Sequence, residues 1–268
     1  MRIEKNFLPT VKHKYQMQKT LVILFVLCGF LSCKTTLILN DINAGNIPNS
    51  QNITRVDSSV VSLVMPYRDS LESDMQETIG FSTVELVKGK PESRLTNYLA
   101  DLFLEEGKRY ARDQALNLTP DIAYLNYGGL RTGLPKGKIT VGKIFELMPF
   151  ENEMVLLKLN GDQMHRFAEK IAENGGDCIA GIKMGIKNGQ AADLEVNGSP
   201  FDPAKDYWIV TNDYVAAGGD NMEMFTHPLK YVKTGIKIRD CFIDHMKKNN
   251  QKGKKISPEL DGRIYMEK

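Results

Sequence analysis

The placement of tight turns constrains the fold of this 268-residue chain more than any other feature. Asn-Gly pairs at 160–161, 188–189 and 197–198 each adjoin a short apolar segment. Such pairs favour tight turns between strands, because both residues tolerate a positive φ. Segments with apolar residues at helical spacing lie between these turns. Hairpins with interspersed helices predict an α+β fold rather than a regular doubly wound sheet.

The same patterns predict the individual elements. The expected strands are 81–87, 122–125, 154–159, 182–186, 193–196 and 207–211. The expected helices are 58–75, 93–113, 140–147, 163–173 and 236–248. Pro66 lies inside the first helical stripe, so that helix either kinks or begins there. With 42% apolar residues, the chain can bury one sizeable core, or at most two small ones.

The N-terminal region has the pattern of an export signal. Residues 21–31 are apolar and uncharged, follow Lys19, and are fewer than the roughly 18–20 that a spanning helix needs. Residues 30–33 (Phe-Leu-Ser-Cys) resemble a bacterial lipobox, which implies cleavage before Cys33 and a lipid on its thiol. The alternative is an ordinary signal peptide that is cut elsewhere. Because sixteen residues precede Met17, we expect translation to start at Met17.

These features divide the chain into three parts. Residues 1–32 are the expected signal peptide, and residues 33–56 the lipidated Cys33 with a flexible tether. Residues 40–52 are rich in Asn, Asp, Gly and Ser, a composition that favours disorder. Residues 57–268 form the expected single domain. We therefore predict an exported lipoprotein of the cell envelope, facing the periplasm or in the outer membrane, held to the membrane by its lipid.

Charge and cysteine content argue against two classes of partner. Residues 1–32 carry five of the 35 basic residues and one of the 33 acidic ones, so the remainder is nearly neutral. The basic run at 247–255 contains no aromatic residue for stacking on bases, and we expect no nucleic-acid partner. No CxxC pair or Cys/His cluster supports a zinc site. Cys178 and Cys241 either pair or remain buried free thiols.

Three loops, 126–131, 148–150 and 212–220, each follow an apolar strand or short helix. Paired glycines allow a backbone to approach a ligand closely. An Arg beside such a loop can bind phosphate or carboxylate, and an Asp after Gly-Gly can accept bonds from sugar hydroxyls. Aromatic rings on two loops can enclose a flat heterocycle. Taken singly, each loop is more typical of a structural turn.

Taken together, the loops resemble the C-terminal, substrate-binding domain of the 5′-nucleotidase family, which includes UDP-sugar hydrolases. The matching motifs are Glu-Ser-Arg-Leu-Thr-Asn at 92–97, Asn-Tyr-Gly-Gly-Leu-Arg at 126–131, Met-Pro-Phe at 148–150, Thr-Asn-Asp-Tyr-Val-Ala-Ala-Gly-Gly-Asp at 211–220 and Asp-Gly-Arg-Ile at 261–264. The resemblance spans 60–264 and implies a layered α/β/β/α-type sandwich.

The resemblance also implies roles for individual residues. Phe150 and Tyr214 match the two aromatic residues that clamp the base, and Asp220 matches the residue that binds the ribose hydroxyls. Asn126 matches a residue at the base edge, and Arg131 one at the ribose-phosphate end. Gly218 and Gly219 belong to the same binding loop as Asp220. Two positions depart from the family: Tyr127 replaces a glycine, and Gly89 an arginine, where Lys88 or Lys90 is a candidate substitute.

Hydrolysis in this family requires a metallophosphoesterase domain with two divalent metals. The four histidines here fit none of its motifs, and the tether leaves no room for that domain, so we expect no metal or cofactor in this chain and no hydrolysis by it alone. The leading hypothesis is the nucleotide-binding subunit of a split 5′-nucleotidase in extracytoplasmic nucleotide catabolism, with metals on a separate metallophosphoesterase. The alternatives are a stand-alone nucleotide or nucleoside receptor and a purely structural lipoprotein.

Overall fold

A computed structural model of the chain describes residues 16, 17, 19, 21 and 57–267. The chain divides into two units, residues 1–56 and 57–268. Cys33, the tether and most of the expected signal peptide lie outside the described residues, so those assignments remain predictions. No helix in the described part of the chain is long and apolar enough to cross a membrane.

The second unit mixes helices and strands, which confirms the predicted α+β class. Its helices are α2 (Ser58–Gln76), α3 (Arg94–Asp113), α4 (Val141–Leu147), α5 (Gly161–Glu173), α6 (Asp213–Ala216) and α7 (Ile238–Gln251), with short 3-10 turns η1 (Tyr127–Gly129), η2 (Gly219–Asn221) and η3 (Glu223–Phe225). Its strands are β1 (Thr78–Ser82), β2 (Ile122–Leu125), β3 (Gly137–Thr140), β4 (Glu153–Leu159), β5 (Cys178–Ala180), β6 (Ile182–Lys187), β7 (Gln190–Val196), β8 (Ser199–Pro200), β9 (Tyr207–Asn212), β10 (Lys230–Lys237) and β11 (Ile264–Met266).

The central sheet has five strands in the order β10-β4-β9-β2-β5. Strands β2 and β9 run parallel, and the other neighbours are antiparallel. A four-stranded sheet has the order β11-β6-β7-β8, and β1 pairs with β3. Because β2 and β9 are parallel, their carboxyl ends meet at one edge of the sheet, where β4 begins.

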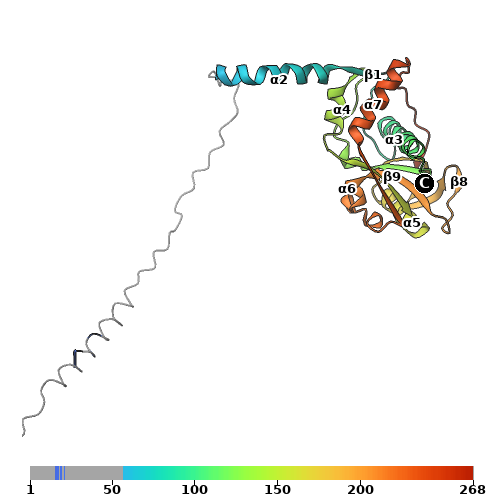
Figure 1. Cartoon of the computed structure of the whole chain (residues 1–268). Helices are drawn as coiled ribbons and strands as arrows, with labels where there is room; N and C mark the ends of the chain where they lie inside the picture. Colours follow the sequence, from blue (N-terminus) through green and yellow to red (C-terminus); the bar gives the residue numbers. More distant parts are fainter. Residues whose placement is uncertain (1–15, 18, 20, 22–56, 268) are drawn as a thin grey trace, which may run out of the picture. The chain divides into compact units, whose positions relative to one another are not determined.

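The five-stranded sheet separates two apolar cores. Along β4, Met154 and Leu156 belong to one core and Val155 and Leu157 to the other, as the period of two in a strand requires. Helices α3, α4 and α7 contribute to the first core, and α5 with β6 to the second. Figure 1 shows α3, α4 and α7 on one side of β9 and α5 on the other.

The motifs at 92–97 and 261–264 hold α3 to the C-terminal segment. Ser93 caps α3 by accepting from the amide of Thr96 at 3.1 Å, as its position before the apolar stripe predicts. The carboxylate of Glu92 accepts from the amide of Gly262 at 3.0 Å. Arg263 donates to both oxygens of Asp101, at 2.7 and 2.9 Å. These two motifs therefore have a structural role that requires no ligand.

Several expectations differ from the structure. The strand expected at 81–87 is wrong: β1 ends at Ser82, where Ser82 Oγ donates to the carbonyl of Val84 at 2.6 Å and the chain turns. Strand β10 was not predicted, because it alternates exposed lysines with few apolar residues at the sheet edge. No residue of α2 is buried, although Met75 at its C-terminal end packs against the first core. Cys178 and Cys241 are buried free thiols.

Candidate functional site

Three loops converge at the edge of the five-stranded sheet where β2 and β9 end. Asn126 directly follows β2, Asn212 is the last residue of β9, and Phe150 lies three residues before β4. Each loop therefore begins or ends on a different strand of one hydrogen-bonded sheet. Loops held by adjacent strands in this way keep their side chains in a defined relative position.

Hydrogen bonds link these loops to one another. The amide of Arg131 donates to the carbonyl of Leu147 at 2.8 Å, which joins the first loop to the end of α4. The amide of Glu153 donates to Oδ1 of Asp213 at 3.0 Å, which joins the second loop to the third. The carbonyl of Asn152 accepts from the amide of Ile238 at 3.0 Å, so α7 also holds the second loop.

The first and third loops share a network of amides and a carboxylate. Asn126 Nδ2 donates to Oδ2 of Asp220 at 2.7 Å, and its Oδ1 accepts from Asn212 Nδ2 at 3.0 Å. Asn212 is almost fully buried, and its Oδ1 accepts from the amide of Val215 at 2.7 Å, which caps α6. Tyr214 Oη donates to Oδ1 of Asp220 at 3.0 Å. Both oxygens of Asp220 thus have protein partners, yet the residue is exposed.

These loops enclose a pocket of about 390 Å3. It is lined by Asn126, Gly128, Gly129, Arg131, Phe150, Asn152, Tyr214 and Asp220. The rings of Phe150 and Tyr214 are 49% and 48% exposed, so both are accessible to a ligand. The structure therefore brings Asn126, Arg131 and the three residues of the expected base and ribose clamp to one cavity. Their roles in binding remain predictions.

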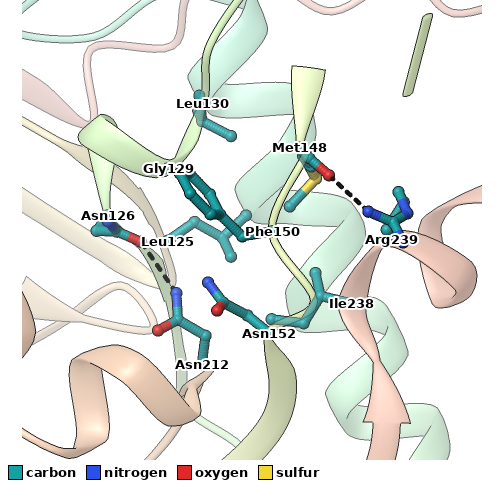
Figure 2. Close-up of a pocket in the computed structure, with 10 residues that line it drawn as sticks. All are labelled: Leu125, Asn126, Gly129, Leu130, Met148, Phe150, Asn152, Asn212, Ile238 and Arg239. Atoms are coloured by element: carbon teal, nitrogen blue, oxygen red, sulfur yellow. Dashed lines mark hydrogen bonds between the residues drawn. The ribbon is translucent and has the colours of Figure 1, made fainter. Parts of the chain in front are cut away.

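A smaller cavity of about 20 Å3 adjoins this pocket and shares four of its residues (Figure 2). In Figure 2 the amide of Asn152 points between Phe150 and Asn212. Arg239, which is buried, donates to the carbonyl of Met148 at 3.3 Å and also pairs with Glu151. Its guanidinium lies 4.0 Å from the ring centroid of Phe145. Arg239 thereby holds the loop that carries Phe150.

Glycines in the loops leave room for neighbouring side chains. A Cβ at Gly219 would lie 2.4 Å from Cε1 of Tyr214, so only glycine allows this ring position. A Cβ at Gly129 would lie 2.9 Å from Oδ1 of Asn126. Gly218 has a φ of 93°. Gly218 and Gly219 are not among the residues that line the pocket, and they shape the loop that carries Tyr214 and Asp220. Their role in binding stays a prediction.

Of the two positions that depart from the family, Tyr127 lies in the first loop and Gly89 lies between Lys88 and Lys90. Lys88 Nζ donates to the carbonyls of Tyr127 and Leu130, at 2.9 and 2.6 Å, and lies 3.9 Å from the ring centroid of Tyr127. Burial, followed by the charge of Arg131, lowers the pKa of Lys88. Lys90 lies 5.0 Å from the same ring. Lys88 is thus engaged in holding the loop and does not line the pocket.

A buried carboxylate supports the loop from the other side. Asp177 accepts from the amides of Tyr127 and Cys178, both at 2.9 Å, and from the hydroxyl of Tyr124 at 3.3 Å. Burial raises the pKa of Asp177. Neither Asp177 nor Arg239 belongs to a motif. Their supporting roles can be recognised from their contacts in the folded structure and not from the sequence.

In the part of the chain that the structure describes, no group of three or more His, Cys, Asp or Glu residues is arranged to hold a metal ion. His165, on α5, is 60% exposed and lies 3.7 Å from Glu169. Asn152 is the pocket residue that the motifs did not single out. Its position two residues after Phe150 was the sequence feature that could have indicated its place in the pocket.

The range matched by a family model includes the residues that line this pocket. Residues 78–227 match the family model described as "5'-nucleotidase, C-terminal domain". The chain is 33% identical over 221 residues to the trifunctional nucleotide phosphoesterase protein YfkN of Bacillus subtilis, covering 74% of this chain and 14% of that protein. It is 24% identical over 185 residues to protein UshA of Escherichia coli, covering 67% of this chain and 32% of that protein. The chain therefore spans a third or less of these relatives.

Solved structures show the same similarity. The 5′-nucleotidase precursor from Thermus thermophilus aligns with a TM-score of 0.64 at 27% identity, over 78% of this chain and 43% of that chain. The NAD nucleotidase NadN of Haemophilus influenzae aligns with a TM-score of 0.59 at 20% identity, over 79% of this chain and 42% of that chain, which shows a shared fold. Family model, sequence relatives and folds agree, and the chain belongs to the 5′-nucleotidase family through its C-terminal domain.

Proposed function

We propose that this protein is the nucleotide- or nucleoside-binding subunit of a split 5′-nucleotidase. In this proposal the pocket binds the base and the ribose. A separate metallophosphoesterase polypeptide supplies the two divalent metals and the attacking water. The complex acts in nucleotide catabolism outside the cytoplasm, where the lipid on Cys33 anchors the binding subunit.

The observation that carries the proposal is the composition of the pocket. Two half-exposed aromatic rings, Phe150 and Tyr214, line the same 390 Å3 cavity as the carboxylate of Asp220. Rings suit a flat base, because offset stacking is favourable over a large contact area. A carboxylate suits a pair of sugar hydroxyls, because each oxygen accepts two hydrogen bonds. Arg131 on the same wall suits a phosphate.

Family membership supports the ligand class. The relatives named above are a nucleotide phosphoesterase and 5′-nucleotidases. The family model that matches is that of the C-terminal domain. Since the residues of this chain offer the binding groups, the proposal assigns phosphate hydrolysis to a partner.

Purification from native membranes tests the split arrangement. The solubilised protein is captured, associated chains are identified by mass spectrometry, and AMP hydrolysis is measured with Mn2+ or Mg2+ for each chain alone and for the mixture. We expect a metallophosphoesterase to copurify and its AMP hydrolysis to rise when this protein is added. The split model fails if no metallophosphoesterase associates and neither chain alters the activity of the other.

Calorimetry on the isolated protein separates the second candidate, a stand-alone receptor. The groups proposed to bind the base and the ribose, Phe150, Tyr214 and Asp220, all belong to this chain, which favours this alternative. Micromolar affinity for nucleosides without a partner, together with no effect on any phosphatase, supports the receptor. Absence of binding to nucleosides and nucleotides, alone and with the partner, leaves only a structural role.

A further inference from the structure

The aromatic residue of the third loop is a tyrosine, and its hydroxyl has a specific partner. Tyr214 Oη donates to Oδ1 of Asp220 at 3.0 Å, while Asn126 Nδ2 donates to Oδ2 at 2.7 Å. A phenylalanine at this position would have no such donor. Each oxygen of the carboxylate therefore accepts one hydrogen bond, one from the first loop and one from the third loop.

The backbone conformation of Asp220 is one that non-glycine residues seldom adopt. Asp220 has φ 55° and ψ 31°, the left-handed region, and it is followed by Asn221 at φ 61°. Non-glycine residues occupy this region at some cost and persist there when surrounding contacts fix them. Asp220 is exposed, so packing alone does not determine its side-chain position. The hydrogen bonds from Asn126 and Tyr214 do.

The same bonds leave the carboxylate able to bind a diol. An ionised carboxylate has about four acceptor positions, two on each oxygen. One position on each oxygen is used by the protein, and one on each remains. Two free positions, one per oxygen, match two adjacent hydroxyl groups. A sugar with a single hydroxyl at this place fills only one of them.

We propose that Tyr214 is a positioning residue whose hydroxyl orients Asp220 and thereby sets the preference for ribonucleosides over 2′-deoxyribonucleosides. Its ring stacks on the base, and its hydroxyl acts on the sugar through the carboxylate. This inference rests on the proposed function of the pocket. It assigns to one side chain both the affinity for the base and the selectivity for the sugar.

The test compares Tyr214→Phe with the wild-type chain, by calorimetry with adenosine, uridine and their 2′-deoxy counterparts. We expect the ratio of ribo to deoxy affinity to fall about fivefold, the effect of about one hydrogen bond, while deoxynucleoside affinity stays unchanged because the ring remains. Tyr214→Ala should weaken all four ligands. Tyr231→Phe, which removes the hydroxyl of a 41% exposed tyrosine on β10, is the matched control and should change nothing.

A second cycle shows whether the hydroxyl acts through Asp220. In an Asp220→Ala background, Tyr214→Phe should have no further effect on the ratio. A ratio that falls again in this background, or that is unchanged by Tyr214→Phe in the wild type, overturns the inference and leaves the proposed function standing. If the wild-type chain binds none of the four nucleosides or their 5′-monophosphates, alone and with the partner, both the inference and the proposed function are overturned.

The unliganded protein provides an independent measurement. Amide chemical shifts of residues 218–221, recorded by NMR, should move in Tyr214→Phe and not in Tyr231→Phe, because the hydrogen bond exists without a ligand. Unchanged shifts in Tyr214→Phe contradict the positioning role even where nucleosides bind.

Discussion

Two carboxylates of this domain accept hydrogen bonds on both oxygens, but one is buried and the other is exposed at the pocket. Glu106, on α3, is 3% exposed; it pairs with Arg109, accepts from Cys241 Sγ of α7 at 3.2 Å and lies 2.8 Å from Nδ1 of His245. Asp220 lies exposed at the pocket and has one protein partner for each oxygen. The first carboxylate is saturated by the fold, and the second keeps acceptor capacity for a ligand.

The electrostatics of Glu106 follow from this saturation. Burial by itself raises a carboxyl pKa, but the bonds from His245, Arg109 and Cys241 outweigh burial and bring the pKa of Glu106 to about 2. Removing one partner of a buried, paired charge is strongly destabilising, so Glu106 is expected to contribute to folding. The contrast indicates that the number of hydrogen bonds to a carboxylate does not by itself mark a functional group. Asp220 differs in being exposed and in having only one protein hydrogen bond on each oxygen.

The largest expected effect comes from removing the buried carboxylate. Glu106→Ala leaves Arg109 and His245 without their shared partner, and we expect the free energy of unfolding to fall by about 3–5 kcal/mol. Urea unfolding measures this. Glu105→Ala, at the 71% exposed neighbour, is the control and should change stability by less than about 0.5 kcal/mol. Equal losses of unfolding free energy in the two variants would contradict the structural role assigned to the buried carboxylate.

The pH dependence of stability sharpens the same contrast. The pKa of Glu106 is about 2 in the folded state against an ordinary 4.5, so its contribution is complete above about pH 4.5 and is lost as the pH falls towards 2. One pKa unit corresponds to about 1.4 kcal/mol, which gives a loss of about 3 kcal/mol. Urea midpoints of the wild type and Glu106→Gln between pH 7 and 2 should converge in acid. Parallel curves would contradict the low pKa.

For a pocket residue, we expect a substitution to weaken ligand binding without much change in the free energy of unfolding. Phe150→Ala should weaken nucleoside binding by about 1–3 kcal/mol, because stacking on the base is lost. Its free energy of unfolding should change little, since the ring is half exposed. Calorimetry and urea unfolding on the same samples measure the two effects. Phe81→Ala, at a 40% exposed phenylalanine on β1, is the control and should leave binding unchanged.

The smallest expected effect tests the shape of the third loop. In Gly219→Ala the new Cβ would lie 2.4 Å from the ring of Tyr214, so the ring must move, and we expect nucleoside affinity to fall by about 1 kcal/mol. At Gly80 the nearest atom to a new Cβ is 3.4 Å away, and Gly80→Ala should bind normally. If both variants bind like the wild type, the position of the Tyr214 ring does not matter.

Local patterns were sufficient for elements whose signals lie within a few residues. The helices expected at 93–113 and 140–147 are α3 and α4, and Ser93 and Thr140 cap them by accepting backbone amide bonds. Strands that depend on distant partners were not: β10 is an edge strand with an alternating, lysine-rich sequence, and β3 exists through its pairing with β1. The strand at 81–87 was misplaced, because its apolar residues suggested a longer strand than the turn after Ser82 allows.

The candidate site shows the same limit. No property of Phe150, Tyr214 or Asp220 taken singly distinguishes it from an ordinary loop residue, and only the order of the motifs suggested that they converge. The supports of the pocket were not identifiable at all. Asp177 and Arg239 act through backbone amides and carbonyls of other segments, and such partners depend on the tertiary fold.

The parallel pair β2 and β9 gives the pocket a mechanical property. Its walls come from segments near positions 126, 150 and 214, which are far apart in the chain but joined through adjacent strands. A ligand bound in the pocket contacts all three segments, so separating them also requires breaking the contacts with the ligand. Occupancy would then slow opening of the whole sheet instead of one loop, and amide hydrogen exchange in β2, β4 and β9 would slow together.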